Sequence, residues 1–152
     1  MVYTCFPWQP ASETNPITTY YVPLVWNDIV LFHATLQLSA MRLQTLQSQI
    51  SGLNLHQLSA ECIRLLRDRV ENEELQLRVS DQTISAVATL AAIEVSCARL
   101  KKKQLLTDKQ HERGNMKMLR MHMDGLKRMV GIRGGLNAIR ETNPIVANST
   151  FW

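Results

Sequence analysis

The feature that most constrains the fold is the stretch TISAVATLAAIEV at residues 83–95. Its side chains are small or apolar on every side of a helix, and Glu94 is the one charge that it contains. A helix that is apolar all round has to be buried among other helices, and this stretch is too short to cross a bilayer. We therefore expect a helix over residues 82–103, capped by Ser80 or Asp81, in the centre of an all-α bundle.

Two amphipathic helices are predicted before this central helix. The first begins at an N-cap, Asn27 or Asp28, and ends near residue 50. Its expected inward face consists of Ile29, Phe32, Leu36, Ala40, Leu43 and Ile50, with further apolar surface from Leu31, Leu38 and Met41. The second covers residues 55–70, with Leu58, Cys62, Leu65 and Leu66 inward. Its expected solvated face carries Glu61, Arg64, Arg67, Asp68 and Arg69, in which oppositely charged residues lie one turn apart.

After the central helix we expect a polar loop at residues 107–115 and a fourth helix at residues 116–130. The apolar stripe of that helix is Leu119, Met123, Leu126 and Val130. Gly134 and Gly135 follow, and glycine is the residue that most readily adopts the left-handed conformation that ends a helix. A short helical turn is expected at residues 136–140, and Asn143 followed by proline signals another helix start. Because only apolar and aromatic residues follow, we interpret this last helix as incomplete and the chain as shortened.

The predicted fold is therefore all-α, an irregular bundle of four main helices with a central apolar helix and an incomplete C-terminal helix. The 152 residues correspond to one domain. Residues 1–22 hold three of the five prolines and show no helical period, so we expect an extended lead-in segment there. Residues 23–152 form the helical domain, which the unfinished last helix makes partial.

The sequence offers no catalytic, cofactor-binding or metal-binding constellation. The four histidines are scattered along the chain. The three cysteines, Cys5, Cys62 and Cys97, lie far apart, and their odd number argues against a set of disulfides and suits a reducing compartment. The methionines around His122 do not share one helix face, so core packing is favoured over copper binding. Glu94 is interpreted as a structural carboxylate paired with an arginine. The N-terminus has no signal-peptide pattern, so the chain is expected to be intracellular, not secreted, and away from membranes.

Positive charge is concentrated in the second half of the chain. Residues 99–133 hold eleven Lys/Arg against three Asp/Glu, whereas the rest holds six against ten, within a net charge of +4. Such a split indicates either a surface for acidic partners or the ordinary solvated faces of one helix and its loop. The candidate basic interaction surface consists of Lys117, Arg120, Lys127 and Arg128. Without a helix-turn-helix pattern or a C-x2-C spacing, sequence-specific DNA binding by this chain is not expected.

Four stretches resemble the fungal-specific transcription factor domain, the regulatory region of zinc binuclear cluster transcription factors. They are DIVLFHATLQLSAMRL from Asp28, ECIRLLRDRV from Glu61, SDQTISAVATLAAIE from Ser80 and MHMDGLKRMVGIRGGL from Met121. The last is the most specific of the four. Seven of its positions match the family signature and are expected to be structural: His122, Gly125, Leu126, Met129, Arg133, Gly134 and Gly135. The zinc cluster is lacking, and against this family we interpret the chain as a truncated domain without the long C-terminal part.

The resemblance implies a nuclear, non-enzymatic helical module with a role in transcription regulation. Its partners would be other proteins or the rest of a regulator, and no cofactor is implied. An alternative is a free-standing helical adaptor or a self-associating module, in which the lead-in segment and an exposed C-terminal tail contact a partner. A third hypothesis, a helical enzyme fragment, would depend on Glu94.

Overall fold

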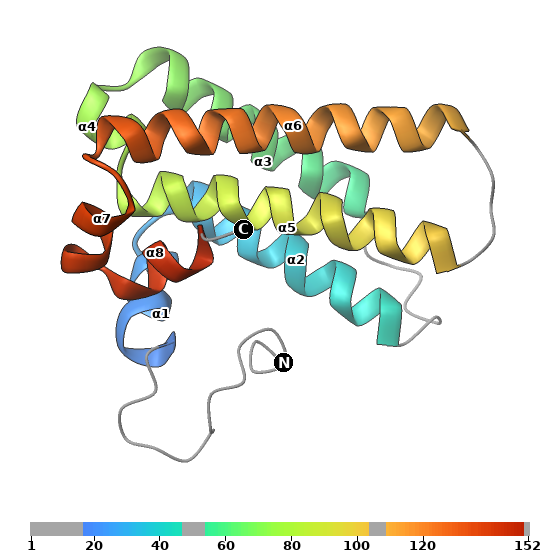
Figure 1. Ribbon diagram of the computed structural model, residues 1–152. Coiled ribbons are helices and arrows are strands. Elements are labelled where there is room, and N and C mark those ends of the chain that lie inside the picture. Colours follow the sequence, from blue (N-terminus) through green and yellow to red (C-terminus); the bar gives the residue numbers. More distant parts are fainter. Residues whose placement is uncertain (1–16, 47–53, 104–108, 151–152) are drawn as a thin grey trace.

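The computed structural model describes residues 17–46, 54–103 and 109–150, and every regular element in these ranges is helical. In chain order they are the π-helix η2 (Ile17–Tyr21), α1 (Val22–Trp26), α2 (Ile29–Leu46), α3 (Leu55–Asn72), α4 (Leu75–Arg78), α5 (Asp81–Lys103), α6 (Lys109–Ile132), α7 (Leu136–Thr142) and α8 (Pro144–Ser149). The prediction of an all-α fold is confirmed for these residues. In Figure 1, α5 lies in the middle of the molecule with α6 along one side of it.

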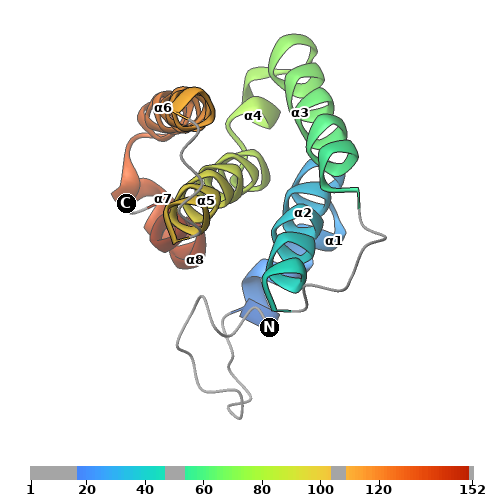
Figure 2. The same ribbon diagram turned by 90° about the vertical axis from the view of Figure 1, so that its right-hand side faces the viewer.

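The helix α5 separates two hydrophobic cores. Ala86 and Leu90 lie on one face and pack with buried residues of α2 and α3. Ile84 and Ala88 lie on the opposite face and pack with α6, α7 and α8. Because both faces are covered, all of residues 83–91 are buried. Figure 2 shows α2 and α6 on different sides of α5, which is the arrangement that an all-round apolar helix requires.

The buried face of α2 differs from the predicted one. Its buried residues are Val30, Leu31, Ala34, Gln37, Ala40 and Met41. Ile29 and Leu36, which the apolar period placed inward, are 54% and 38% exposed. The prediction for these two residues is wrong because the true inward stripe includes a small alanine and a glutamine. Those residues let α2 approach α5 closely but contribute little to an apolar period.

A buried ion pair joins the start of α2 to the end of α3. The Nη1 atom of Arg69 lies 2.6 Å from Oδ2 of Asp28, and the two side chains are 10% and 7% exposed. The other oxygen of Asp28 accepts a hydrogen bond from the backbone N–H of Leu31 at 2.9 Å, so Asp28 is the N-cap of the two residues that the sequence offers. The placement of Arg69 on the solvated face of α3 is wrong. It follows Cys62 and Leu66 by seven and three residues and thus continues the inward stripe.

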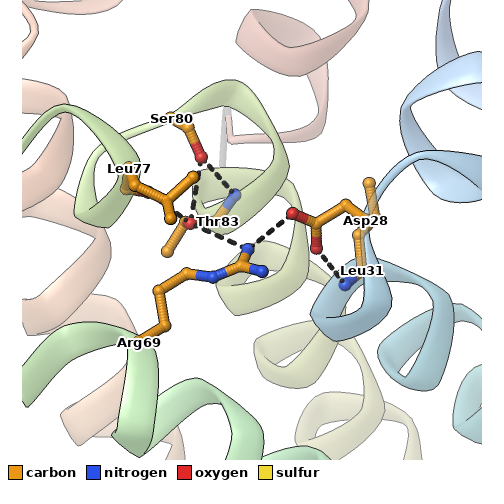
Figure 3. Close-up of polar contacts among 6 residues, drawn as sticks. All are labelled: Asp28, Leu31, Arg69, Leu77, Ser80 and Thr83. Atoms are coloured by element: carbon orange, nitrogen blue, oxygen red, sulfur yellow. Dashed lines mark hydrogen bonds and ion pairs between the residues drawn. The ribbon is translucent and has the colours of Figure 1, made fainter. Parts of the chain in front are cut away.

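The same arginine reaches the start of α5 (Figure 3). Its Nη1 donates to Oγ1 of Thr83 at 3.4 Å, and Thr83 in turn donates to the carbonyl of Leu77 at 2.8 Å. Since the single hydroxyl proton of Thr83 is used there, Ser80 is the donor in the 3.0 Å contact between their hydroxyls. Ser80 also caps α5 by accepting from the N–H of Thr83 at 3.2 Å. The junction therefore ties α2, α3, α4 and α5 together.

On the outer side of α3, the predicted ion pairs are confirmed. Arg64 lies 2.7 Å from Glu61 and 2.8 Å from Asp68, and all three side chains are exposed to solvent. On the inner side, Cys62 is fully buried while Leu65 and Leu66 pack against the core that α3 shares with α2. The predicted inward and solvated faces of α3 are thus correct except at Arg69.

The helix α6 begins at Lys109, seven residues before the predicted start. The prediction of a loop at residues 109–115 is wrong, while residues 107 and 108 lie outside the described ranges. Lys, Gln, Glu and Arg in this segment are good helix formers, and together they outweigh the cost of Gly114 and Asn115 in a helix interior.

Both ends of the described chain also differ from expectation. Residues 17–22 are helical where an extended segment was predicted, and residues 1–16 lie outside the described ranges. The division at residue 22 between a lead-in segment and a partial domain stays a prediction. Asn143 caps α8 through the N–H of Val146 at 3.3 Å, as the sequence predicts. The prediction of an exposed tail is wrong for Ile145, Val146 and Ala147, which are buried against α5 and its neighbours, while residues 151 and 152 lie outside the described ranges.

We predict that Arg69→Met destabilises the protein by about 3–5 kcal/mol, because it leaves the buried carboxylate of Asp28 without its partner. The double variant Asp28→Asn/Arg69→Met should recover at least about 1 kcal/mol, since the amide oxygen keeps the cap but carries no charge. Urea unfolding followed by circular dichroism measures both. The control, Arg64→Met on the exposed side of α3, should have little effect. A double variant no more stable than Arg69→Met would contradict the ion-pair argument.

Candidate interaction surface on helix α6

All eleven residues that the sequence singles out lie on α6 or in the turn after it. The structure divides them into two groups. The signature residues other than Gly125 face α5 or form the end of the helix, whereas the four basic residues are exposed to solvent. The inward residues bear on how α6 is held against α5, and the basic residues bear on what α6 can bind.

Three signature residues lie on the side of α6 that packs against α5. Leu126 is 2% exposed and Met129 packs beside it in the second core. His122 is 6% exposed, and burial lowers the pKa of its imidazole, so the ring is neutral at pH 7. Gly125 differs from these, because a Cβ at its position would meet nothing within 4 Å. Internal packing thus does not require a glycine there.

Gly134 and Gly135 end α6 in a Schellman motif. The N–H of Gly135 donates to the carbonyl of Val130 at 2.8 Å, and the N–H of Gly134 donates to that of Gly131 at 3.1 Å. Both glycines have positive φ, 87° and 91°, which L side chains rarely adopt. Gly135 also precedes the first residue of α7. The pair therefore sets the angle at which the chain leaves α6 and enters α7.

Arg133 fastens this end of α6 to the beginning of α5. Its Nη2 lies 2.9 Å from Oδ1 of Asp81, and its Nη1 donates to the carbonyl of Val79 at 3.1 Å. The two side chains of the ion pair are 26% and 18% exposed. The sequence singled out Arg133 only through the family likeness. Its partner Asp81 had been considered only as a helix cap, because residues 52 positions apart carry no local signal of contact.

The outer side of α6 forms what we call the α6 basic face, defined by Lys117, Arg120, Lys127 and Arg128. All four residues are exposed, and their spacing places them on one side of the helix. Asp124 is also exposed on this side. Four cations against one carboxylate give the face a local charge of +3. The helix packs on α5 and α7 with its other side, so this face is left to solvent.

Among the residues that the structure describes, no group of three or more His, Cys, Asp or Glu side chains could hold a metal ion. Burial raises the pKa of the Cys62 thiol to about 11, so this cysteine is protonated and unreactive at neutral pH. Glu94 is half-buried and interacts with another residue. Met116 and Met121 are exposed while Met118 and Met123 are half-buried, so these sulfur atoms do not converge on one point.

Comparison with known families gives a match to the fungal specific transcription factor domain over residues 2–149. The match covers nearly the whole chain, including all of α1 to α8. The chain belongs to this family. No curated protein and no solved structure matches it. Among the described residues, none of the helices combines the length and apolar character needed to span a membrane.

Two glycine-to-alanine substitutions near the end of α6 should have opposite effects on stability. Gly134→Ala forces a Cβ into a left-handed residue and brings it 3.4 Å from the Cβ of Ala138, so it should cost about 1–2 kcal/mol. Gly131→Ala adds a methyl group in open space within the helix, so it should stabilise the protein by up to about 1 kcal/mol. Thermal unfolding measures both. Equal effects at the two positions would contradict the role assigned to the positive φ of Gly134.

Proposed function

We propose that this chain is a non-enzymatic helical module that acts in the nucleus on transcription, through contacts with other proteins or with other parts of a regulator. The observation that carries the proposal is the family match across residues 2–149. Members of this family are regulatory regions of transcription factors, which are not typically enzymes.

Sequence-specific DNA reading is not part of the proposal. The chain contains no pair of cysteines at C-x2-C spacing, and its longest basic helix is anchored to α5 along one side. What α6 presents is a charged surface with apolar side chains, and such a surface is typical of protein recognition. The module would thus modify the output of a DNA-bound regulator rather than select its target.

A reporter assay tests the proposal. We expect the chain, fused to a heterologous DNA-binding domain in fungal cells, to change transcription of the reporter several-fold relative to that DNA-binding domain alone. A fluorescent fusion should accumulate in the nucleus. The matched control is the same fusion carrying Leu90→Asp, which places a charge in the first core and should abolish the effect. An output equal to that of the DNA-binding domain alone would contradict the proposed role.

A second candidate function is self-association, and the outer side of α1 and α2 favours it. Trp26 is 73% exposed, Ile29 54%, Leu36 38% and Leu46 67%. Trp26 and Phe32 contact each other with ring centroids 6.0 Å apart, which extends the apolar surface. Exposed apolar surface of this extent favours association. Because none of these side chains is charged, two copies could pair through them without repulsion.

Sedimentation velocity over a range of protein concentrations tests self-association. We expect a dimer that weakens markedly in Trp26→Ser/Ile29→Ser, because the two side chains are the most exposed apolar groups at the junction of α1 and α2. The matched control is Val70→Ser/Leu75→Ser, which changes two exposed apolar residues of α3 and α4 and should leave the dimer intact. A protein that stays monomeric at every concentration would exclude this function.

A further inference from the structure

The outer faces of α3 and α6 differ in how they arrange their cations. On α3, Arg64 lies between Glu61 and Asp68, so its charge is neutralised within the helix. On α6, no ion pair joins the α6 basic face to a carboxylate among the residues that the structure describes. Like charges one turn apart, such as Lys117 and Arg120, slightly destabilise a helix. Asp124 lies one turn from Arg120, Lys127 and Arg128, but a single carboxylate leaves the face with a net charge of +3.

Large apolar side chains are exposed on the same side of α6. Met116 is 47% exposed, Met121 54% and Ile132 57%. They lie between and beside the cations, along about 24 Å of helix. Methionine side chains are flexible and polarisable, and they suit surfaces that adapt to an apolar partner. A partner that covers this face must therefore satisfy positive charges and bury apolar groups at the same time.

Gly131 adds a second indication of a contact. It is exposed on this face between Lys127 and Arg128 on one side and Ile132 on the other, and a Cβ there would meet nothing within 4 Å. Neither a positive φ nor internal packing requires a glycine at this position. In a helix interior glycine costs up to about 1 kcal/mol relative to alanine. Its effect is to leave the backbone of α6 accessible to close approach.

We propose that the outer face of α6 binds an acidic, amphipathic helical segment of a partner protein. The inference rests on the proposed function and specifies the partner class. Carboxylates of such a segment would pair with the α6 basic face, and its apolar residues, spaced three and four positions apart, would cover the methionines and Ile132. Gly131 would be the point at which the two helices come closest.

A nucleic acid fits the same surface less well. Phosphates would pair with the four cations, but they offer no apolar surface to cover Met116, Met121 and Ile132. An acidic helix uses both features, because its apolar side removes these three side chains from water. Of the two partner classes, the acidic protein segment accounts for more of what the face presents.

Fluorescence anisotropy with a labelled synthetic peptide of Glu, Leu and Ala, patterned as an amphipathic helix, tests the proposal on the full chain. At physiological ionic strength we expect Lys127→Glu/Arg128→Glu to weaken peptide binding by at least about tenfold. The matched control is Arg67→Glu/Arg140→Glu, which makes the same change of net charge at exposed residues of α3 and α7 and should alter binding by no more than about twofold. Equal losses from both pairs would overturn the proposal.

Gly131→Ala gives an independent arm, because the variant should unfold at a higher temperature and yet bind the peptide more weakly. Weaker binding cannot then be attributed to loss of fold. Wild-type affinity in this variant, or tighter binding of a DNA duplex than of the peptide at the same face, would overturn the proposal. The reporter assay separates the two levels: an active fusion without peptide binding rejects only this docking site, whereas peptide binding without reporter activity rejects only the proposed function.

Discussion

Both hydrophobic cores of this protein are built on one helix, so the other helices are positioned by what they must cover on α5. Its two faces cannot be buried by a single neighbour, because residues on opposite sides of a helix lie about 10 Å apart. The helices α2 and α3 cover one face, and α6, α7 and α8 cover the other. Each covering helix therefore has one side against the protein and one side in solvent. The surfaces proposed for recognition are those outer sides.

Two ion pairs, with their hydrogen bonds, connect the helices of the two cores at the start of α5. One is the Asp28–Arg69 ion pair with its extension to Thr83, which holds the first core. The other is the Arg133–Asp81 ion pair, which holds the end of α6 in the second core. Asp81 also lies in the first turn of α5, where a negative charge is favourable. The first turn of α5 thus contacts both arginines, Arg69 and Arg133, and the relative placement of α2 and α6 depends on it.

Local chemistry predicted much of this fold. The cap at Asn143 and the glycine pair after α6 act within a few residues, so the sequence alone indicated them, and it narrowed two further caps to the pairs that contain Asp28 and Ser80. The inward face of α2 and the burial of Arg69 depend instead on helices far away in the chain. An apolar period assigns a face only when apolar residues are confined to one side, and on α2 Ile29, Leu36 and Leu46 are apolar and exposed.

The candidate surface on α6 was predictable in part for the same reason. A helical stripe of apolar residues implies that the residues between them face outward, and this placed Lys117, Arg120, Lys127 and Arg128 correctly on the exposed side. The lack of neutralising partners among the described residues required the structure. The exposure of Met121 agrees with the sequence, because Met123 and not Met121 continues the apolar stripe of Leu119, Leu126 and Val130.

The two outer surfaces differ in physical character, and this bears on how they would be used. The side formed by α1 and α2 is mainly apolar, with Arg42 exposed one turn before Leu46, so association through it would depend only weakly on salt. The side formed by α6 is strongly positive, so binding there would weaken as salt screens the charges. Because α2 and α6 lie on different sides of α5 (Figure 2), occupation of one surface does not block the other. A self-associated form would therefore still present the α6 basic face of each copy, and it would gain affinity for an acidic partner that carries more than one binding segment.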